Sequence, residues 1–142
     1  MLIDVAHASF ATVGEIADVS DAPVILSHSQ LKWGAKQHPR LLDDDHAKIV
    51  AATGGVIGMW PPGFGNDTFA DFVDNTLRMV ELVGVDHVGL GTDMDGNYKP
   101  VFDNYTQLPD WTEALLAKSL SVSEVGMLVG GNAFRVLRQV LK

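Results

Sequence analysis

The sequence predicts a parallel α/β fold built from four βα units, and three observations support this. Four short apolar runs rich in β-branched residues lie at 2–6, 23–27, 55–60 and 87–92, and each has the length and composition of a buried strand. Helix-length sequence follows every run. The connections are short, which favours consecutive parallel strands joined by right-handed crossovers.

The first two helices are predicted from their end signals. Ser9 is a suitable N-cap for a helix that continues to Val19. The second helix is expected from Asp43 to Ala52, and the glycines at positions 54 and 55 end it.

The third helix, from Thr68 to Val83, is predicted most clearly, and Gly84 ends it. A largely apolar stripe recurs with helical spacing. It consists of Phe69, Phe72, Val73, Thr76, Leu77, Val80 and Val83.

An irregular stretch at 97–108 follows the fourth strand. Ser121 and Glu124 then form a capping-box pattern, and a last helix is expected over 133–141 after two glycines and an asparagine.

Composition excludes several classes of protein. The 142 residues, 46% of them hydrophobic, suffice for one domain spanning 1–142. No apolar stretch approaches the roughly 20 residues of a membrane span, and no signal peptide is visible, which slightly favours the cytoplasm. A net charge of −8 argues against nucleic acid as a partner. Without cysteine, His, Asp and Glu are the only strong metal ligands.

Four βα units fit two architectures. One is a small open sheet with helices on both faces, and the other is half of an eight-stranded barrel, which typically has about 250 residues. The first strand pattern begins at Leu2 with no polar or capping segment before it. We therefore expect a partial domain, the C-terminal half of a (β/α)8 TIM-type barrel.

Two histidines stand out because each closes an apolar run. His7 and His28 are 21 positions apart (28 − 7), and Asp93 follows the fourth run. The carboxyl ends of parallel strands meet at one edge of a sheet, where ligands bind, and neighbouring strands are about 4.8 Å apart. The two imidazoles could therefore bind one metal ion, although hydrogen-bonded structural histidines explain the pattern about equally well.

Other candidate features have simpler explanations. The run from Asp93 to Gly96 resembles the start of a calcium loop, but glycine comes two positions early and Asn104 stands where glutamate is needed. His38, His46 and His87 have no matched partner in the pattern. Trp60, at the end of the third run, either stiffens a turn or walls a pocket.

Several ordered motifs over nearly the whole chain resemble the membrane (renal) dipeptidase family of zinc peptidases. They comprise Ile3-Asp4-Val5-Ala6-His7-Ala8-Ser9, Pro23-Val24-Ile25-Leu26-Ser27-His28-Ser29, His38-Pro39-Arg40, Gly54-Gly55-Val56-Ile57-Gly58, the segment from Leu82 to Gly96 and the segment from Gly130 to Leu137. The resemblance implies strands five to eight of a metallo-dependent hydrolase barrel with a two-zinc centre that cleaves dipeptides.

The resemblance also implies roles for four residues. His7 and His28 match the two ligands of one zinc ion. Arg40 matches the arginine that holds the substrate carboxylate, and Asp93 matches a catalytic aspartate that contacts substrate near the metals. Arg40 lies twelve positions after His28, one more than the family pattern, and Leu41 stands where asparagine commonly follows.

The remaining ligands of the family pattern would lie upstream of Met1. We therefore expect at most one zinc ion here and no activity from the chain alone, with a dipeptide as the substrate of a full-length parent. The alternative is a non-catalytic half-barrel that functions only by assembling with its missing half, with another chain or with itself as a homo-oligomer. A different metal-dependent hydrolase would explain the strand-end residues but not the later motifs.

Overall fold

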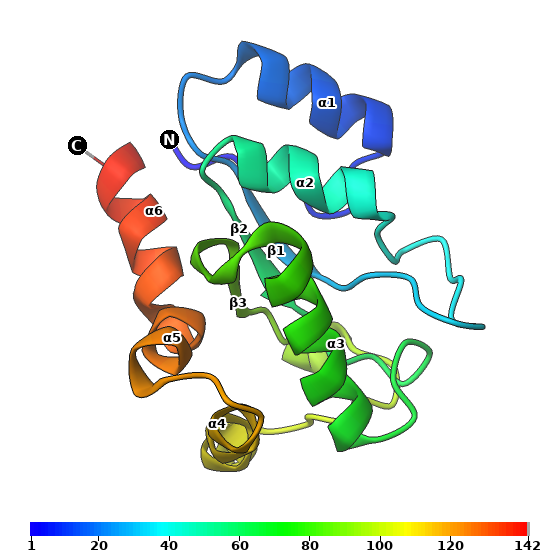
Figure 1. Ribbon diagram of the computed structural model, residues 1–142. Helices are drawn as coiled ribbons and strands as arrows, with labels where there is room; N and C mark the ends of the chain where they lie inside the picture. Colours follow the sequence, from blue (N-terminus) through cyan, green and yellow to red (C-terminus); the bar gives the residue numbers. More distant parts are fainter. Residues whose placement is uncertain (142) are drawn as a thin grey trace.

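The computed structural model describes residues 1–141, and its centre is a parallel sheet of three strands in the order β1-β2-β3 (Figure 1). Residues Ile25, Ile57 and Gly58 pair with Val56, Val88 and Gly89 respectively. The bounds are β1 Ile25–Ser29, β2 Val56–Met59, β3 Val88–Leu90, α1 Phe10–Val19, α2 Asp44–Ala52, α3 Phe69–Val83, α4 Leu108–Ala117, α5 Val122–Gly126 and α6 Asn132–Val140. Short helical turns cover 85–87, 94–96, 105–107 and 127–131.

The parallel α/β class is confirmed, but the first predicted strand is wrong. Segment 2–6 meets β1 through a single parallel bridge between Asp4 and Ile25. Beyond that bridge, the Asp4 side chain takes the place of strand-to-strand backbone hydrogen bonds. Its Oδ1 accepts hydrogen bonds from the backbone N–H groups of Ala6 (3.0 Å) and Ser27 (3.1 Å). The chain then turns away at His7, whose φ is 65°.

The predicted helices are confirmed with small shifts at their ends. Ser9 caps α1 by accepting the backbone N–H of Thr12. Asp43 precedes α2 but makes no side-chain cap bond, since its carboxylate pairs with Lys32. The capping boxes before α3 and α5 both form.

One face of the sheet packs against helices. The buried apolar side chains of this face and of α2 and α3 form a continuous core. Its members include Leu26, Ile57, Met59, Val88, Val50, Phe72, Val73 and Met79. A gain of about 25 cal/mol for each Å² of apolar surface removed from water makes this core the main stabilising term.

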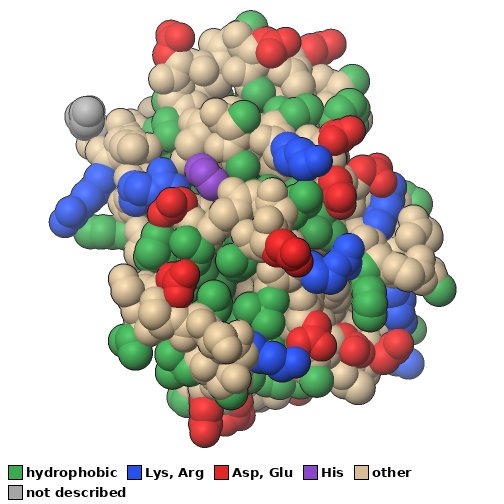
Figure 2. Space-filling model, viewed as in Figure 1, with side chains coloured by type: hydrophobic (Ala, Val, Ile, Leu, Met, Phe, Trp, Pro, Cys, Tyr) green, Lys and Arg blue, Asp and Glu red, His purple; other side chains and the backbone are tan. Residues whose placement is uncertain are grey.

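The opposite face of the sheet is covered only in part, by the turn at 127–131 and by α6. Because side chains alternate along a strand, Ile25, Val56, Gly58 and Gly89 share this face. They line an apolar cavity of about 300 Å³ together with residues of the turn at 127–131 and of α6. Apolar side chains also reach the surface that carries α3, α5 and α6, among acidic and basic groups (Figure 2). None of the helices in residues 1–141 is long and apolar enough to span a membrane.

Candidate active site

The candidate site lies at the carboxyl ends of the strands, where the structure brings four predicted residues together. His28 lies at the end of β1, and His7 follows the segment that bridges β1. Arg40 comes from the loop between β1 and α2, and Asp93 from the loop after β3. The site therefore draws on the ends of β1 and β3 and on the bridged edge segment, at the edge of the sheet where parallel α/β folds usually bind ligands.

The two imidazoles meet directly. His7 Nε2 lies 3.0 Å from His28 Nε2, and the rings lie edge to face with centroids 4.8 Å apart. Two nitrogen ligands about 2.0–2.1 Å from a tetrahedral zinc ion lie roughly 3.3 Å from each other. The pair therefore fits two corners of one zinc site.

The imidazole of His28 is held in place from its far side. Its Nδ1 lies 3.0 Å from Ser27 Oγ, which leaves Nε2 facing His7. Hydrogen bonds of this kind orient metal-binding histidines and set their tautomer. Burial is the main cause that lowers the pKa of His28; Asp93 opposes this, whereas His7 and Arg40 lower the pKa further. The neutral ring keeps a lone pair for a metal ion.

Asp93 completes the polar end of the site. Its Oδ2 lies 3.7 Å from His28 Nε2, and its side chain is 29% exposed. Asp93 and His7 both have left-handed backbone conformations, with φ values of 46° and 65°. Such conformations are uncommon for residues other than glycine and recur at functional sites.

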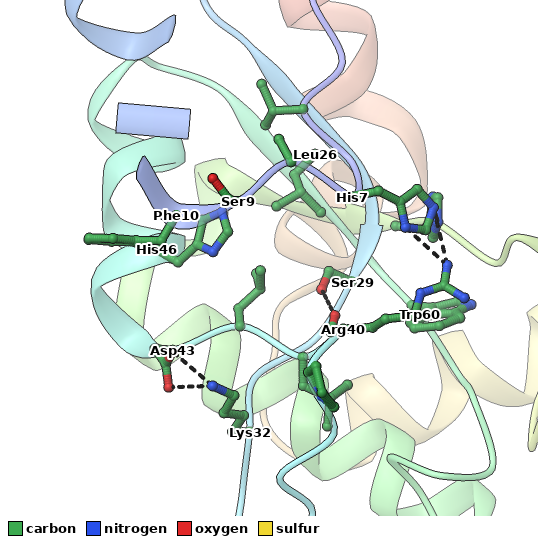
Figure 3. Close-up of a pocket in the computed structure, with 16 residues that line it drawn as sticks. His7, Ser9, Phe10, Leu26, Ser29, Lys32, Arg40, Asp43, His46 and Trp60 are labelled. Atoms are coloured by element: carbon green, nitrogen blue, oxygen red, sulfur yellow. Dashed lines mark hydrogen bonds and ion pairs between the residues drawn. The ribbon is translucent and has the colours of Figure 1, made fainter. Parts of the chain in front are cut away.

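Arg40 lies against the histidine pair. Its Nη2 is 3.1 Å from His7 Nε2 and 3.2 Å from His7 Nδ1, as the dashed lines in Figure 3 show. The guanidinium carbon also stands 4.6 Å from the centre of the Trp60 ring, a cation–π arrangement. Trp60 is buried and meets the edge of His28 as well, with centroids 5.5 Å apart. It therefore walls the site.

A cavity of about 250 Å³ adjoins these residues (Figure 3). Its lining runs from His7, His28 and Arg40 to His46 and Phe10 at the starts of α2 and α1. Within residues 1–141, no group of three or more His, Asp or Glu side chains is arranged to hold a metal ion. His7 and His28 are thus a pair of candidate ligands, and the described chain does not complete a four-ligand set.

The other histidines have separate partners. His38 stacks on Phe64 with centroids 4.2 Å apart, and His46 meets Phe10 edge to face. His87 Nδ1 lies 2.9 Å from the backbone oxygen of Gly55, at the opposite end of the sheet from the site.

Sequence reasoning missed the groups that support the site. Ser27 precedes His28 directly, and a hydroxyl beside a candidate ligand was the available signal. Gln30 and Asn66 lie beneath the site in a buried hydrogen bond of 3.0 Å, and their separation of 36 positions follows no local pattern.

Comparison with known proteins identifies the family. The sequence model of the membrane dipeptidases, peptidase family M19, matches residues 1–142. The chain belongs to the membrane dipeptidase family. Among its relatives, dipeptidase aclJ of Aspergillus oryzae is 32% identical over 99% of this chain, and dipeptidase verJ of Clonostachys rogersoniana is 30% identical over 99%. The matched regions are 35% and 37% of those proteins, so this membrane dipeptidase chain spans about a third of their length.

Solved structures share the fold of this chain. An amidohydrolase from Pseudomonas aeruginosa superposes with a TM-score of 0.85 at 26% identity, covering 99% of this chain and 52% of that one. The metallopeptidase dipeptidase AC gives a TM-score of 0.81 at 23% identity, covering 96% and 43%. The second likeness concerns the fold alone.

Proposed function

We propose that this chain supplies part of the active site of a zinc-dependent dipeptidase. His7 and His28 hold one zinc ion, Arg40 binds the free carboxylate of the dipeptide, and Asp93 contacts the substrate beside the metal. The observation that carries the proposal is the 3.0 Å approach of the two Nε2 atoms at the ligand-binding edge of a parallel sheet, in a member of a dipeptidase family.

The residues around the pair suit hydrolysis of a small peptide. When bound, zinc supplies a Lewis acid and lowers the pKa of a coordinated water. Arg40 offers planar N–H donors that match a carboxylate, and Trp60 limits where its guanidinium can go. Asp93 presents an anionic group on the same side as His28, where it can accept a proton or hold an ammonium group.

The chain itself is proposed to be half of a (β/α)8 barrel. The three-stranded sheet with its bridged edge segment supports this, because the turn at 127–131 and α6 cover the face with Ile25 and Val56 only in part and leave an apolar cavity there. The curated relatives are also much longer than this chain. A site with two of its zinc ligands holds at most one ion weakly, so the chain alone is proposed to be inactive.

A second candidate function is a non-catalytic half-barrel that acts only in an assembly. The same partly covered sheet face favours it, since an apolar cavity of about 300 Å³ would be filled by another half-barrel or a second copy. Dipeptidase activity of a full-length parent would contradict this second candidate function.

Zinc titration of the purified chain tests the metal site. We expect about one equivalent of zinc to bind the wild-type chain, and His28→Ala to weaken binding at least about tenfold because one of two imidazole ligands is lost. His87→Ala is the matched control, since His87 contacts Gly55 at the far end of the sheet and should leave zinc binding unchanged. Equal zinc affinity in the His28→Ala and wild-type chains would refute the assignment.

A further inference from the structure

Two loops meet where Arg40 lies on Trp60. Arg40 belongs to the loop between β1 and α2, and Trp60 begins the loop between β2 and α3. Arg40 is an exposed residue with a long side chain, so the direction of its guanidinium depends on the groups it contacts, which are the Trp60 ring and His7. A contact that fixes the two loops relative to each other therefore helps to fix the guanidinium through the ring.

The end of β1 holds both loops through its backbone. The carbonyl oxygen of Ser29 accepts the N–H of Trp60 at 2.9 Å, and the carbonyl oxygen of Gln30 accepts the N–H of Leu42 at 2.8 Å. Ser29 Oγ also donates to the carbonyl oxygen of Arg40 at 3.2 Å. Two consecutive residues thus connect the loop that carries the cation to the loop that carries the ring.

A row of buried amides continues this connection. Gln30 Oε1 accepts a hydrogen bond from Asn66 Nδ2 at 3.0 Å, and Asn66 Oδ1 accepts one from Asn75 Nδ2 of α3 at 2.8 Å. Asn66 Nδ2 also donates to the carbonyl oxygen of Pro62 at 3.2 Å. Gln30, Asn66 and Asn75 are 0%, 1% and 2% exposed. Gln30 Nε2 is buried without a hydrogen-bond partner, but Gln30 Oε1 and both polar atoms of the Asn66 side chain are paired. These bonds hold their geometry because a further unpaired polar group would be costly at this depth.

The loop also fits closely over Gln30. A Cβ atom at Gly65 would collide with Gln30 Nε2, so only glycine allows this approach. Phe64, next to it, packs edge to face on Trp60 with centroids 5.1 Å apart. The row of buried amides therefore influences the position of the Trp60 ring in two ways, through the backbone of the loop at 60–66 and through the packing of Phe64 in that loop.

We propose that Gln30 and Asn66 are positioning residues for Arg40. Their side-chain hydrogen bond fixes the loop at 60–66 against the end of β1, which sets the ring on which the guanidinium lies. The consequence for ligand binding rests on the proposed function, in which Arg40 binds a carboxylate. The positioning itself involves no metal and no catalysis.

Nuclear magnetic resonance of the 142-residue chain tests the positioning. The Arg40 Hδ and Hε signals should be displaced upfield by the Trp60 ring current, and Trp60→Leu sets the undisplaced reference. We expect Asn66→Leu to lose most of the displacement. Asn132→Leu is the matched control, because Asn132 is an equally buried amide (2% exposed) that donates to Val85 and Val88 away from the loop. This variant should keep the displacement.

Two further measurements make the outcome decisive. If Asn66→Leu does not fold, Asn75→Leu removes one bond of the same row and should reduce the displacement in part.

In the zinc-loaded chain, N-acetylglycine should shift the Arg40 signals saturably, with a dissociation constant about three- to fivefold higher in Asn66→Leu, as loss of a cation–π contact predicts. Unchanged Arg40 signals in folded Asn66→Leu would overturn the positioning. If N-acetylglycine leaves the Arg40 signals of the wild-type chain unshifted, the proposed binding of a carboxylate by Arg40 is overturned instead.

Discussion

At the residue scale, the candidate site depends on side chains aimed at one point from unusual backbone conformations. His7 turns out of the edge segment with φ at 65°, and Asp93 leaves β3 with φ at 46°. His28 needs no such turn because it lies within β1 and Ser27 fixes its ring. The two residues with left-handed backbone and the hydrogen-bonded histidine converge on the same space, and uncommon conformations of this kind recur at functional sites.

His46 gives the chain a pH-dependent stability. Burial is the main cause that lowers its pKa, Lys32 lowers it further, and Asp43 opposes the shift. The folded chain therefore favours neutral His46, whereas the unfolded chain binds a proton below its ordinary pKa of about 6.5. The free energy of unfolding should fall as the pH drops from about 7 through 6.5 towards 5.

Urea denaturation at several pH values checks this. The His46→Gln chain should show a smaller loss of stability over the same range, and the loss that remains belongs to His28, whose pKa is also lowered. Identical pH slopes for the two proteins would show that His46 does not titrate differently on folding.

The sequence revealed only part of the site. His7, His28 and Asp93 could be placed together because strand ends of a parallel sheet share an edge. The position of Arg40, in contrast, came from family resemblance alone, since a loop residue has no periodicity to place it. The contact between Gln30 and Asn66 could not be predicted, because it depends on how two loops pack.

At the element scale, helix ends could be predicted because a helix cap involves residues that are close in the sequence. The capping box of α5 formed as its residues predict: Ser121 Oγ accepts the N–H of Glu124 at 3.3 Å, and Glu124 Oε2 accepts the N–H of Ser121 at 2.7 Å. The first predicted strand failed because a strand needs its neighbours. Segment 2–6 has β1 on one side, and Asp4 ends the pairing early.

Removal of the α3 cap should destabilise the chain by a modest amount. Thr68→Ala leaves the N–H of Asp71 without its side-chain acceptor, and loss of a Thr cap typically costs about 1 kcal/mol. Chemical denaturation measures the difference. Ser123→Ala, at an exposed position in α5, is the control and should change stability by less than about 0.5 kcal/mol. Equal stability of Thr68→Ala and the control would show that the cap contributes nothing.

At the scale of the whole molecule, the sheet has one face covered by α2 and α3 and one face covered only in part, by the turn at 127–131 and α6. The core lies between the sheet and helices α2 and α3. The other face lines an apolar cavity, and near it Val129 and Leu137 are 40% and 37% exposed. Contiguous apolar surface of this kind is typical of a protein interface. In the proposed half-barrel, a partner or further sequence would cover this surface.

Dipeptide hydrolysis by the purified chain with zinc, with its mass measured by light scattering on the same sample, tests the half-barrel account most directly. The account predicts a mass above the 15.3 kDa of one chain and no turnover, because the partly open apolar face is proposed to pack against a partner and the described residues do not complete a set of metal ligands. A stable monomer that hydrolyses a dipeptide at an ordinary enzymatic rate, about 1–1,000 per second, would contradict it.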